Sequence, residues 1–434
     1  MSSPASNVRY LSWATMVLDD SPDVRAAGYA ASDGTDPAVW REGIARALRS
    51  MSSAVACDAV SHLEARGGAD SRQLLVDALT ATRSGLTPVW IRGGIGTLDC
   101  ARHRADPDVP VPPVLPWSDE PAPDGFAELL YDALNQLIGE GRRRVQRARR
   151  DPRFDQTPAP GTDLVGWADH EAALVAELET VTLEDCRESA RGIAGTGVVH
   201  PALHRHLQRN PDVASRLAAG LTPLQLVRFE AEPDRGGLGA PSLIWHHREL
   251  AVDLRVLVDA SARIGVARPY DAVAHVVFSP HSLRPTDPAL AWPLFVERPD
   301  RLDDALGLAV PEVTPTPHEL TIALGILEQM PVLPSRYLPL VSRVAVDGAA
   351  RPRAAARQVI ERHGNPVRVA TGGLAHGRAG VRASAASWLQ QLDAVQSLPD
   401  VRRAAAEERS AAARASMRAV IDQLSRRTAS SRPR

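Results

Sequence analysis

Three segments in the last quarter of the chain repeat one pattern. Each begins with an arginine (Arg353, Arg382 and Arg414), and these arginines stand 29 and then 32 residues apart. This spacing is typical of a repeat built from two helices and their turns. Apolar residues follow at positions +3, +6 and +7, which lie on one face of an α-helix. They are Ala356, Val359 and Ile360, then Ala385, Trp388 and Leu389, then Met417, Val420 and Ile421.

This pattern predicts stacked helix pairs, an architecture that usually serves as a binding surface. The residues expected in the structural core are Trp388, Leu389, Ile360 and Ile421. In the last segment Met417, Val420, Ile421 and Leu424 form one stripe, so the final helix is expected to close the array itself.

Helical periodicity also covers much of the rest of the chain. It predicts helices near residues 37–50, 72–84, 125–150, 167–178 and 183–193. Asp36 and Ser71 are expected to cap the first two of these, and Pro37 suits the first helical position. Alternation with a period of two is almost absent, so the predicted class is all-α.

Proline-rich and polar stretches indicate the domain organisation. We expect a less regular helical N-terminal region at 1–105, a Pro-rich linker at 106–124 and a long-helix region at 125–198. A HEAT-like helical array (an α-solenoid) is expected at 199–425. The remaining residues, 426–434, are polar and basic, and are expected to be a disordered tail.

Four pieces of the second half resemble one protein family. They are residues 221–229 (LTPLQLVRF), 253–257 (DLRVL), 292–308 and 381–389 (VRASAASWL). They resemble a bacterial family described as molybdate metabolism regulator-like, in which HEAT-like helices precede a separate C-terminal domain. The resemblance implies a helical array and no particular chemistry, and that C-terminal domain is expected to be absent here.

The composition excludes several classes of protein. The formal charge of −2 gives no overall field for nucleic acid or anionic lipid. All 50 basic residues are arginine, which removes the phosphate-binding lysine of P-loop enzymes and any Schiff-base lysine. The cysteines, Cys57, Cys100 and Cys186, are far apart, as in a reducing compartment. No signal peptide or membrane span is recognisable, so a cytoplasmic location is expected.

Three histidines lie close together in the sequence and are candidate metal ligands. His200 and His204 are four residues apart and His206 is close by, a spacing that lets two imidazoles share a metal on a helix. No carboxylate stands between them as in a metalloprotease motif. We therefore predict no metal site, no catalytic residues and no cofactor, and keep a metal enzyme using residues 200–206 as an alternative.

An arginine run ends the predicted helix at 125–150. Arg143, Arg147 and Arg150 fall on one helical face, with Arg142 and Arg153 beside them. Such an array can hold phosphate oxygens, although cations also favour a helix C-terminus for electrostatic reasons. Arg142, Arg143, Arg147 and Arg150 are thus candidate anion-binding residues, and a nucleic-acid-associated regulator is a second alternative.

The function expected from these features is a non-catalytic intracellular scaffold or regulatory adaptor. Its helical-repeat surface would bind a macromolecular partner, most simply a protein. No membrane partner is expected.

Overall fold

The computed structural model describes most of the helical chain and parts of the loops. The described residues are 13, 15–19, 21–50, 53–81, 91, 92, 94, 95, 98, 108–114, 122–150, 167–194, 203, 207, 210, 213, 216, 217, 221, 222, 225, 231, 232, 237, 238, 253–263, 268–278, 287–308 and 314–430. Apart from β1 (Ala231–Glu232) and β2 (Gly237–Leu238), a short antiparallel pair, the regular structure in these ranges is helical. The all-α prediction is confirmed at this level.

The chain forms two compact units. The first comprises Met1–Arg102 and Pro113–Leu294, and the second His103–Pro112 and Phe295–Arg434. This division differs from the predicted one, because residues 199–294 belong to the first unit instead of the array. Within the first unit, an ion pair at 2.5 Å joins Arg268, just before α16 (Pro269–Phe278), to Glu64 of α4 (Ser53–Arg66).

The N-terminal helices pack mainly on one another. They are α2 (Pro22–Ala30), the 3₁₀ turn η1 (Ser32–Gly34), α3 (Pro37–Leu48), α4 and α5 (Gly68–Ala81). The predicted cap of α3 is confirmed, since Asp36 accepts hydrogen bonds from the backbone N–H groups of Ala38 and Val39 at 2.8 and 3.3 Å. The predicted cap Ser71 is wrong, because α5 begins earlier and Ser71 lies buried inside it.

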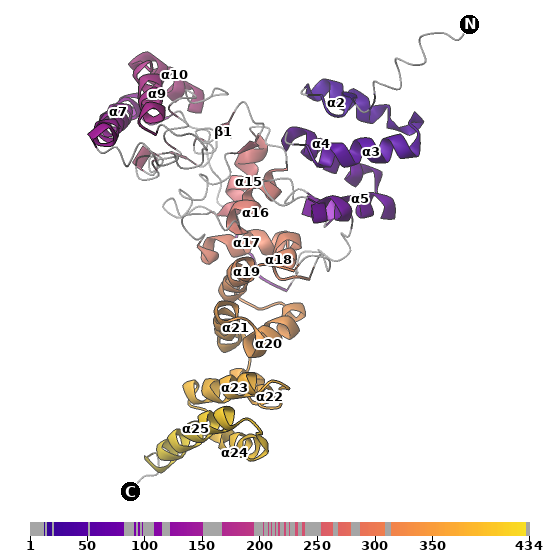
Figure 1. The fold of residues 1–434 in the computed structure, drawn as a ribbon, viewed down its shortest axis with the longest axis vertical. Coiled ribbons are helices and arrows are strands. Elements are labelled where there is room, and N and C mark those ends of the chain that lie inside the picture. The colour runs from indigo at the N-terminus through magenta and orange to yellow at the C-terminus, as the bar shows by residue number, and fades with distance from the viewer. Residues whose placement is uncertain are drawn as a thin grey trace. The chain divides into compact units, whose positions relative to one another are not determined.

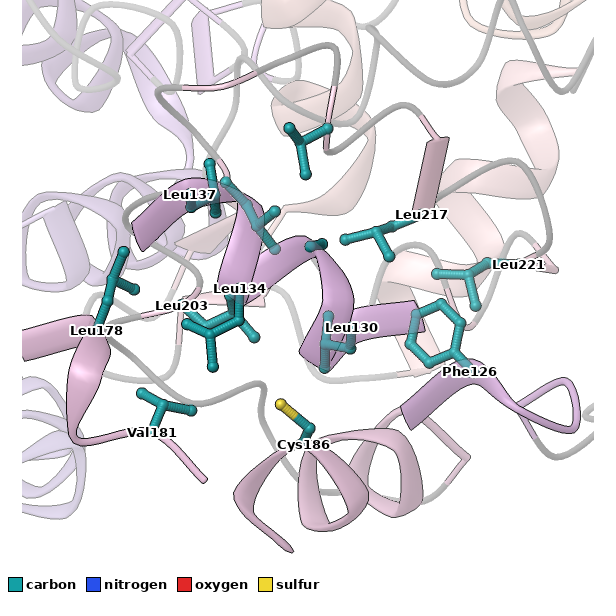
Figure 2. Packing of buried hydrophobic residues seen from close by; sticks show 13 residues of the cluster. Phe126, Leu130, Leu134, Leu137, Leu178, Val181, Cys186, Leu203, Leu217 and Leu221 are labelled. Carbon is teal, nitrogen blue, oxygen red and sulfur yellow. The ribbon is translucent and has the colours of Figure 1, made fainter. Parts of the chain in front are cut away.

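The long predicted helix is α7 (Phe126–Arg150), which packs against α9 (Trp167–Glu179) and α10 (Leu183–Ala194). Figure 2 shows its apolar face, with Phe126, Leu130, Leu134 and Leu137 directed into one cluster that also holds Cys186 of α10. Gly141 allows the close approach of α7 and α9, since a Cβ atom there would lie 2.4 Å from Val175. The other helices of this unit are α15 (Leu254–Arg263) and α16, and α17 (Pro288–Glu297) spans the boundary.

The second unit continues with short helices that pack in sequence. They are α18 (Asp300–Ala305), α19 (Pro317–Gln329), η4 (Ser335–Tyr337), α20 (Leu338–Asp347), α21 (Ala350–His363), α22 (Pro366–Gly373), α23 (Ala379–Gln391), η5 (Val395–Ser397), α24 (Leu398–Glu407) and α25 (Ala411–Ser430). In Figure 1, α19, α21, α23 and α25 follow one side of this unit, and α20, α22 and α24 follow the other. The α20–α21, α22–α23 and α24–α25 pairs each pack together.

Local sequence signals start these helices. A proline occupies one of the first two positions of α19, α20, α22 and α24, where its missing N–H is not needed. Thr316 and Glu319 form a reciprocal capping box on α19, and Asn365 accepts a hydrogen bond from the N–H of Arg368 on α22. These signals recur along the unit and set where α19, α20, α22 and α24 begin.

The three sequence repeats coincide with α21, α23 and α25. Residues at +3, +6 and +7 are buried in α21 and α23, including Ile360, Trp388 and Leu389. In α25, Met417 and Val420 are buried. Ile421 is only half-buried, so the prediction that it lies in the core is corrected. The main contacts of helix α25 are with α23 and α24. Helix α21, in contrast, packs against helices that precede it and follow it in the chain.

In two of the three repeats, the leading arginine donates to a backbone carbonyl at the same distance along the chain. Arg382 donates to the carbonyl oxygen of His376, six residues earlier, at 2.7 Å, and Arg414 donates to the carbonyl oxygen of Glu408, also six residues earlier. Each guanidinium therefore closes the loop that leads into its own helix. This contact gives the recurring arginine a structural reason.

The predicted disordered tail is partly wrong. Helix α25 continues to Ser430, and Thr428 donates from its hydroxyl to the carbonyl of Leu424 at 3.0 Å. Arg427 also pairs with Asp393 at 2.6 Å. Residues 431–434 lie outside the described ranges.

Candidate functional site

A groove of about 710 Å³ runs between α20 and α22 of the second unit. From α20 it is lined by Leu338, Pro339, Ser342, Arg343, Val346 and Asp347. From α22 and its flanking turns it is lined by Gly364, Asn365, Arg368, Val369, Gly372, Gly373 and His376. Its volume is in the range of ligand pockets.

The apolar part of the groove comes mainly from three side chains. Leu338, at the start of α20, is 42% exposed, which is high for a leucine. Val346 of α20 and Val369 of α22 are half-buried beside it. The groove thus offers water-exposed apolar surface that a ligand would cover.

Two adjacent glycines keep the groove in shape, by different means. A Cβ atom on Gly373 would lie 2.9 Å from the Cβ of Ala385, so this glycine lets α22 pack closely on α23. A Cβ atom on Gly372 would meet nothing within 4 Å, because it would project into open space. Gly372 therefore leaves room in the groove without being needed for packing.

The charged residues of the groove differ in whether they have ion-pair partners. Arg343 and Arg368 are exposed, and neither has an ion pair or a side-chain hydrogen bond within the described part of the chain. Asp347, in contrast, pairs with Arg378 and lies 3.5 Å from the His376 ring. The two arginines are consequently available to a ligand, while the carboxylate already has partners.

Helix geometry holds these groups together. Val346 and Asp347 stand three and four residues after Arg343 on α20, and Arg368 and Gly372 are four residues apart on α22. Residues at these spacings share one helical face. The Asn365 cap and Pro366 fix where α22 begins and hence which face Arg368 occupies.

The arginine run at the end of α7 is divided by the structure. Arg142 pairs with Glu179 at 2.7 Å, so it is not an open anion site and this part of the prediction is corrected. Arg144 is held likewise by Glu171. Arg143, Arg147 and Arg150 are exposed and have no ion pair with any described residue.

The described residues offer no metal-ligand cluster and no activated thiol. Among the described residues there is no set of three or more His, Cys, Asp or Glu side chains placed to hold a metal. His200, His204 and His206 lie outside those residues. Burial raises the pKa of the Cys57 thiol to about 12 and that of Cys186 to about 11, which is the opposite of an activated nucleophile.

The groove was not predicted from the sequence. Its strongest signal is the Gly372–Gly373 pair within an otherwise helical segment, which indicates close packing or a special site. Arg343 and Arg368 could not be singled out from the sequence, because every basic residue of the chain is an arginine.

Three comparisons with known proteins gave no match: no family model, no curated protein and no solved structure corresponds to the chain. Among the described residues, no helix combines the length and apolar character needed to cross a membrane.

Proposed function

We propose that this protein is a non-catalytic scaffold or regulatory adaptor whose HEAT-like helical array binds a macromolecular partner. The observation that carries the proposal is the groove between α20 and α22, with exposed apolar surface beside two arginines that lack a partner in the described chain. Successive helix pairs provide a continuous surface of this kind, and binding is its usual use. Membership of the molybdate metabolism regulator-like family is part of this proposal and rests on the sequence resemblance alone.

A cytoplasmic location is proposed on chemical grounds. Cys57 and Cys186 are both free thiols. Unpaired cysteines are typical of a reducing compartment.

A crosslinking experiment tests the function. Leu338 is replaced by a photo-crosslinking amino acid in cells that naturally produce the protein, and the captured chain is identified by mass spectrometry. The captured chain is then purified, and its affinity is measured by calorimetry for the wild type and for Gly372→Leu and Gly380→Leu. Gly380, in α23, has equally open space but does not line the groove.

The wild type and Gly380→Leu are expected to bind with equal affinity, and Gly372→Leu at least about tenfold more weakly, a loss of roughly 1.4 kcal/mol. The proposal is abandoned if no captured chain binds the purified wild type saturably.

A second candidate function is polyanion binding at the end of α7. The observation in its favour is that Arg143, Arg147 and Arg150 share one exposed face without described ion-pair partners. Three phosphate contacts would give weak, strongly salt-dependent binding without sequence preference.

A further inference from the structure

We infer that the groove between α20 and α22 takes a short protein segment that carries both apolar and acidic side chains. This inference rests on the proposed function and specifies the chemistry of the partner.

The charge of the groove favours carboxylates. Arg343 and Arg368 line it from opposing helices, and both residues are exposed. The planar guanidinium presents paired N–H donors that match the two oxygens of a carboxylate. Asp347 does not compete for them, because it already faces Arg378 and His376.

The apolar surface requires that the ligand be more than an anion. Leu338, Val346 and Val369 lie in the same groove as the two arginines. Burying such side chains is the main source of affinity at protein interfaces, while exposed charges mainly set selectivity. A segment with apolar residues between or beside acidic ones satisfies both kinds of surface.

The size of the groove suits a short segment. Helix α20 has 10 residues and α22 has 8, which correspond to lengths of about 15 and 12 Å. An extended peptide covers this distance in roughly four or five residues. A linear motif is therefore sufficient, and no folded partner domain is required.

Nucleic acid fits the groove less well. None of the lining residues is Phe, Tyr or Trp, so there is no platform on which bases could stack. Two arginines also supply few phosphate contacts, and most of the groove surface is apolar.

Fluorescence anisotropy with labelled probes tests the inference. The first probe is a synthetic peptide of about 12 residues built from Leu, Glu and Ser, long enough to exceed the groove. Two matched peptides replace Glu by Lys or Leu by Ser. A single-stranded oligonucleotide and dodecanoate, used as unlabelled competitors, represent nucleic acid and a free apolar anion. All are measured with the full chain.

The Leu–Glu peptide is expected to bind, and each matched peptide to bind at least about tenfold more weakly. Arg343→Glu together with Arg368→Glu should weaken binding by roughly tenfold, as should Gly372→Leu. Arg418→Glu reverses an exposed arginine on α25 outside the groove and should leave the affinity unchanged. Thermal melting identifies any variant that fails to fold, in which case the Gln variants of Arg343 and Arg368 replace the Glu variants.

The inference is overturned if the Leu–Lys peptide binds as well as the Leu–Glu peptide. It is equally overturned if dodecanoate or the oligonucleotide displaces the peptide from the groove at lower concentration than unlabelled peptide does. If no peptide binds but the partner captured through Leu338 does, the inference fails and the proposed function stands. If neither binds, both fail.

Discussion

Both carboxylate oxygens of Glu408 accept hydrogen bonds from Arg382, from Nε at 2.7 Å and from Nη2 at 2.8 Å. The Glu408 side chain is inaccessible to solvent, while Arg382 is 21% exposed. Glu408 also accepts from the N–H of Ser410 at 2.8 Å. This pair joins the start of α23 to the turn between α24 and α25, so two successive repeats share one charge pair.

The pair makes the stability of the second unit depend on pH. The hydrogen-bonded Arg382 guanidinium holds the pKa of Glu408 at about 2, below its ordinary value of 4.5. A carboxylate with a lowered folded-state pKa stabilises the fold above its unfolded pKa, and this contribution is lost as the pH falls from about 4.5 towards 2. Urea titrations should show Glu408→Gln less stable than the wild type at pH 7, with the gap closing at low pH. A gap that stays constant across this range contradicts the assignment.

Replacing Trp388 should destabilise the array strongly. Its side chain is 1% exposed, Arg357 lies over its ring at 4.6 Å, and its Nε1 donates to Glu361 at 2.8 Å. Trp388→Ala should cost roughly 3–5 kcal/mol, because it leaves a large cavity. Trp388→Phe, which keeps a ring but loses the hydrogen bond, should cost about 1–2 kcal/mol. Denaturant unfolding gives both values, and a loss for Trp388→Ala no larger than that for Trp388→Phe would contradict the cavity argument.

The two glycines of α22 should respond in opposite directions to the same change. Gly372→Ala should stabilise the protein by roughly 0.5–1 kcal/mol, since alanine favours the helix and its Cβ meets nothing. Gly373→Ala should destabilise it, because the new Cβ would lie 2.9 Å from that of Ala385. Thermal melts of the two variants check this, and a destabilised Gly372→Ala would show that the space beside Gly372 is not open.

The buried thiols should be protected from reagents. Because burial raises the pKa of Cys57 to about 12 and of Cys186 to about 11, the thiolate is scarce at neutral pH. In a Cys100→Ser background, which removes the cysteine outside the described residues, Ellman's reagent should react slowly with the native protein. In denaturant it should react with two thiols at once. Fast reaction in the native state would place at least one thiol at the surface.

The end of α7 gives a sharp test of polyanion binding. Neutralising Arg143, Arg147 and Arg150 to Gln should lower the affinity for heparin at low salt and reduce the salt dependence. Arg142→Gln is the matched control, because Arg142 is already paired with Glu179. It should leave heparin affinity nearly unchanged. If the wild type does not bind, or if the variant lacking Arg143, Arg147 and Arg150 binds as tightly as the wild type, the arginine run is simply a solvated helix end.

The helices of the array could be predicted because their signals are local. Apolar residues at +3, +6 and +7 from Arg353, Arg382 and Arg414 lie within two turns of each other, and burial follows directly from that spacing. Ile421 departs from the pattern because its exposure depends on which helices pack around α25. The sequence of α25 alone does not determine those contacts.

Contacts between distant residues account for what the sequence did not reveal. Arg268, just before α16, pairs with Glu64, 204 residues away, within the first unit. The groove likewise depends on Gly373 meeting Ala385 and on Arg343 and Arg368 lacking partners. Both are outcomes of packing between helices, which single-sequence periodicity does not report.

The contact from Arg382 and from Arg414 to a carbonyl six residues earlier has a consequence for folding during synthesis. The partners of Arg382 and Arg414 leave the ribosome just before the arginines themselves. Such local contacts close with little loss of chain entropy and favour fast folding. Each loop can therefore close as soon as its helix emerges, and the array can grow one helix pair at a time from its N-terminal end.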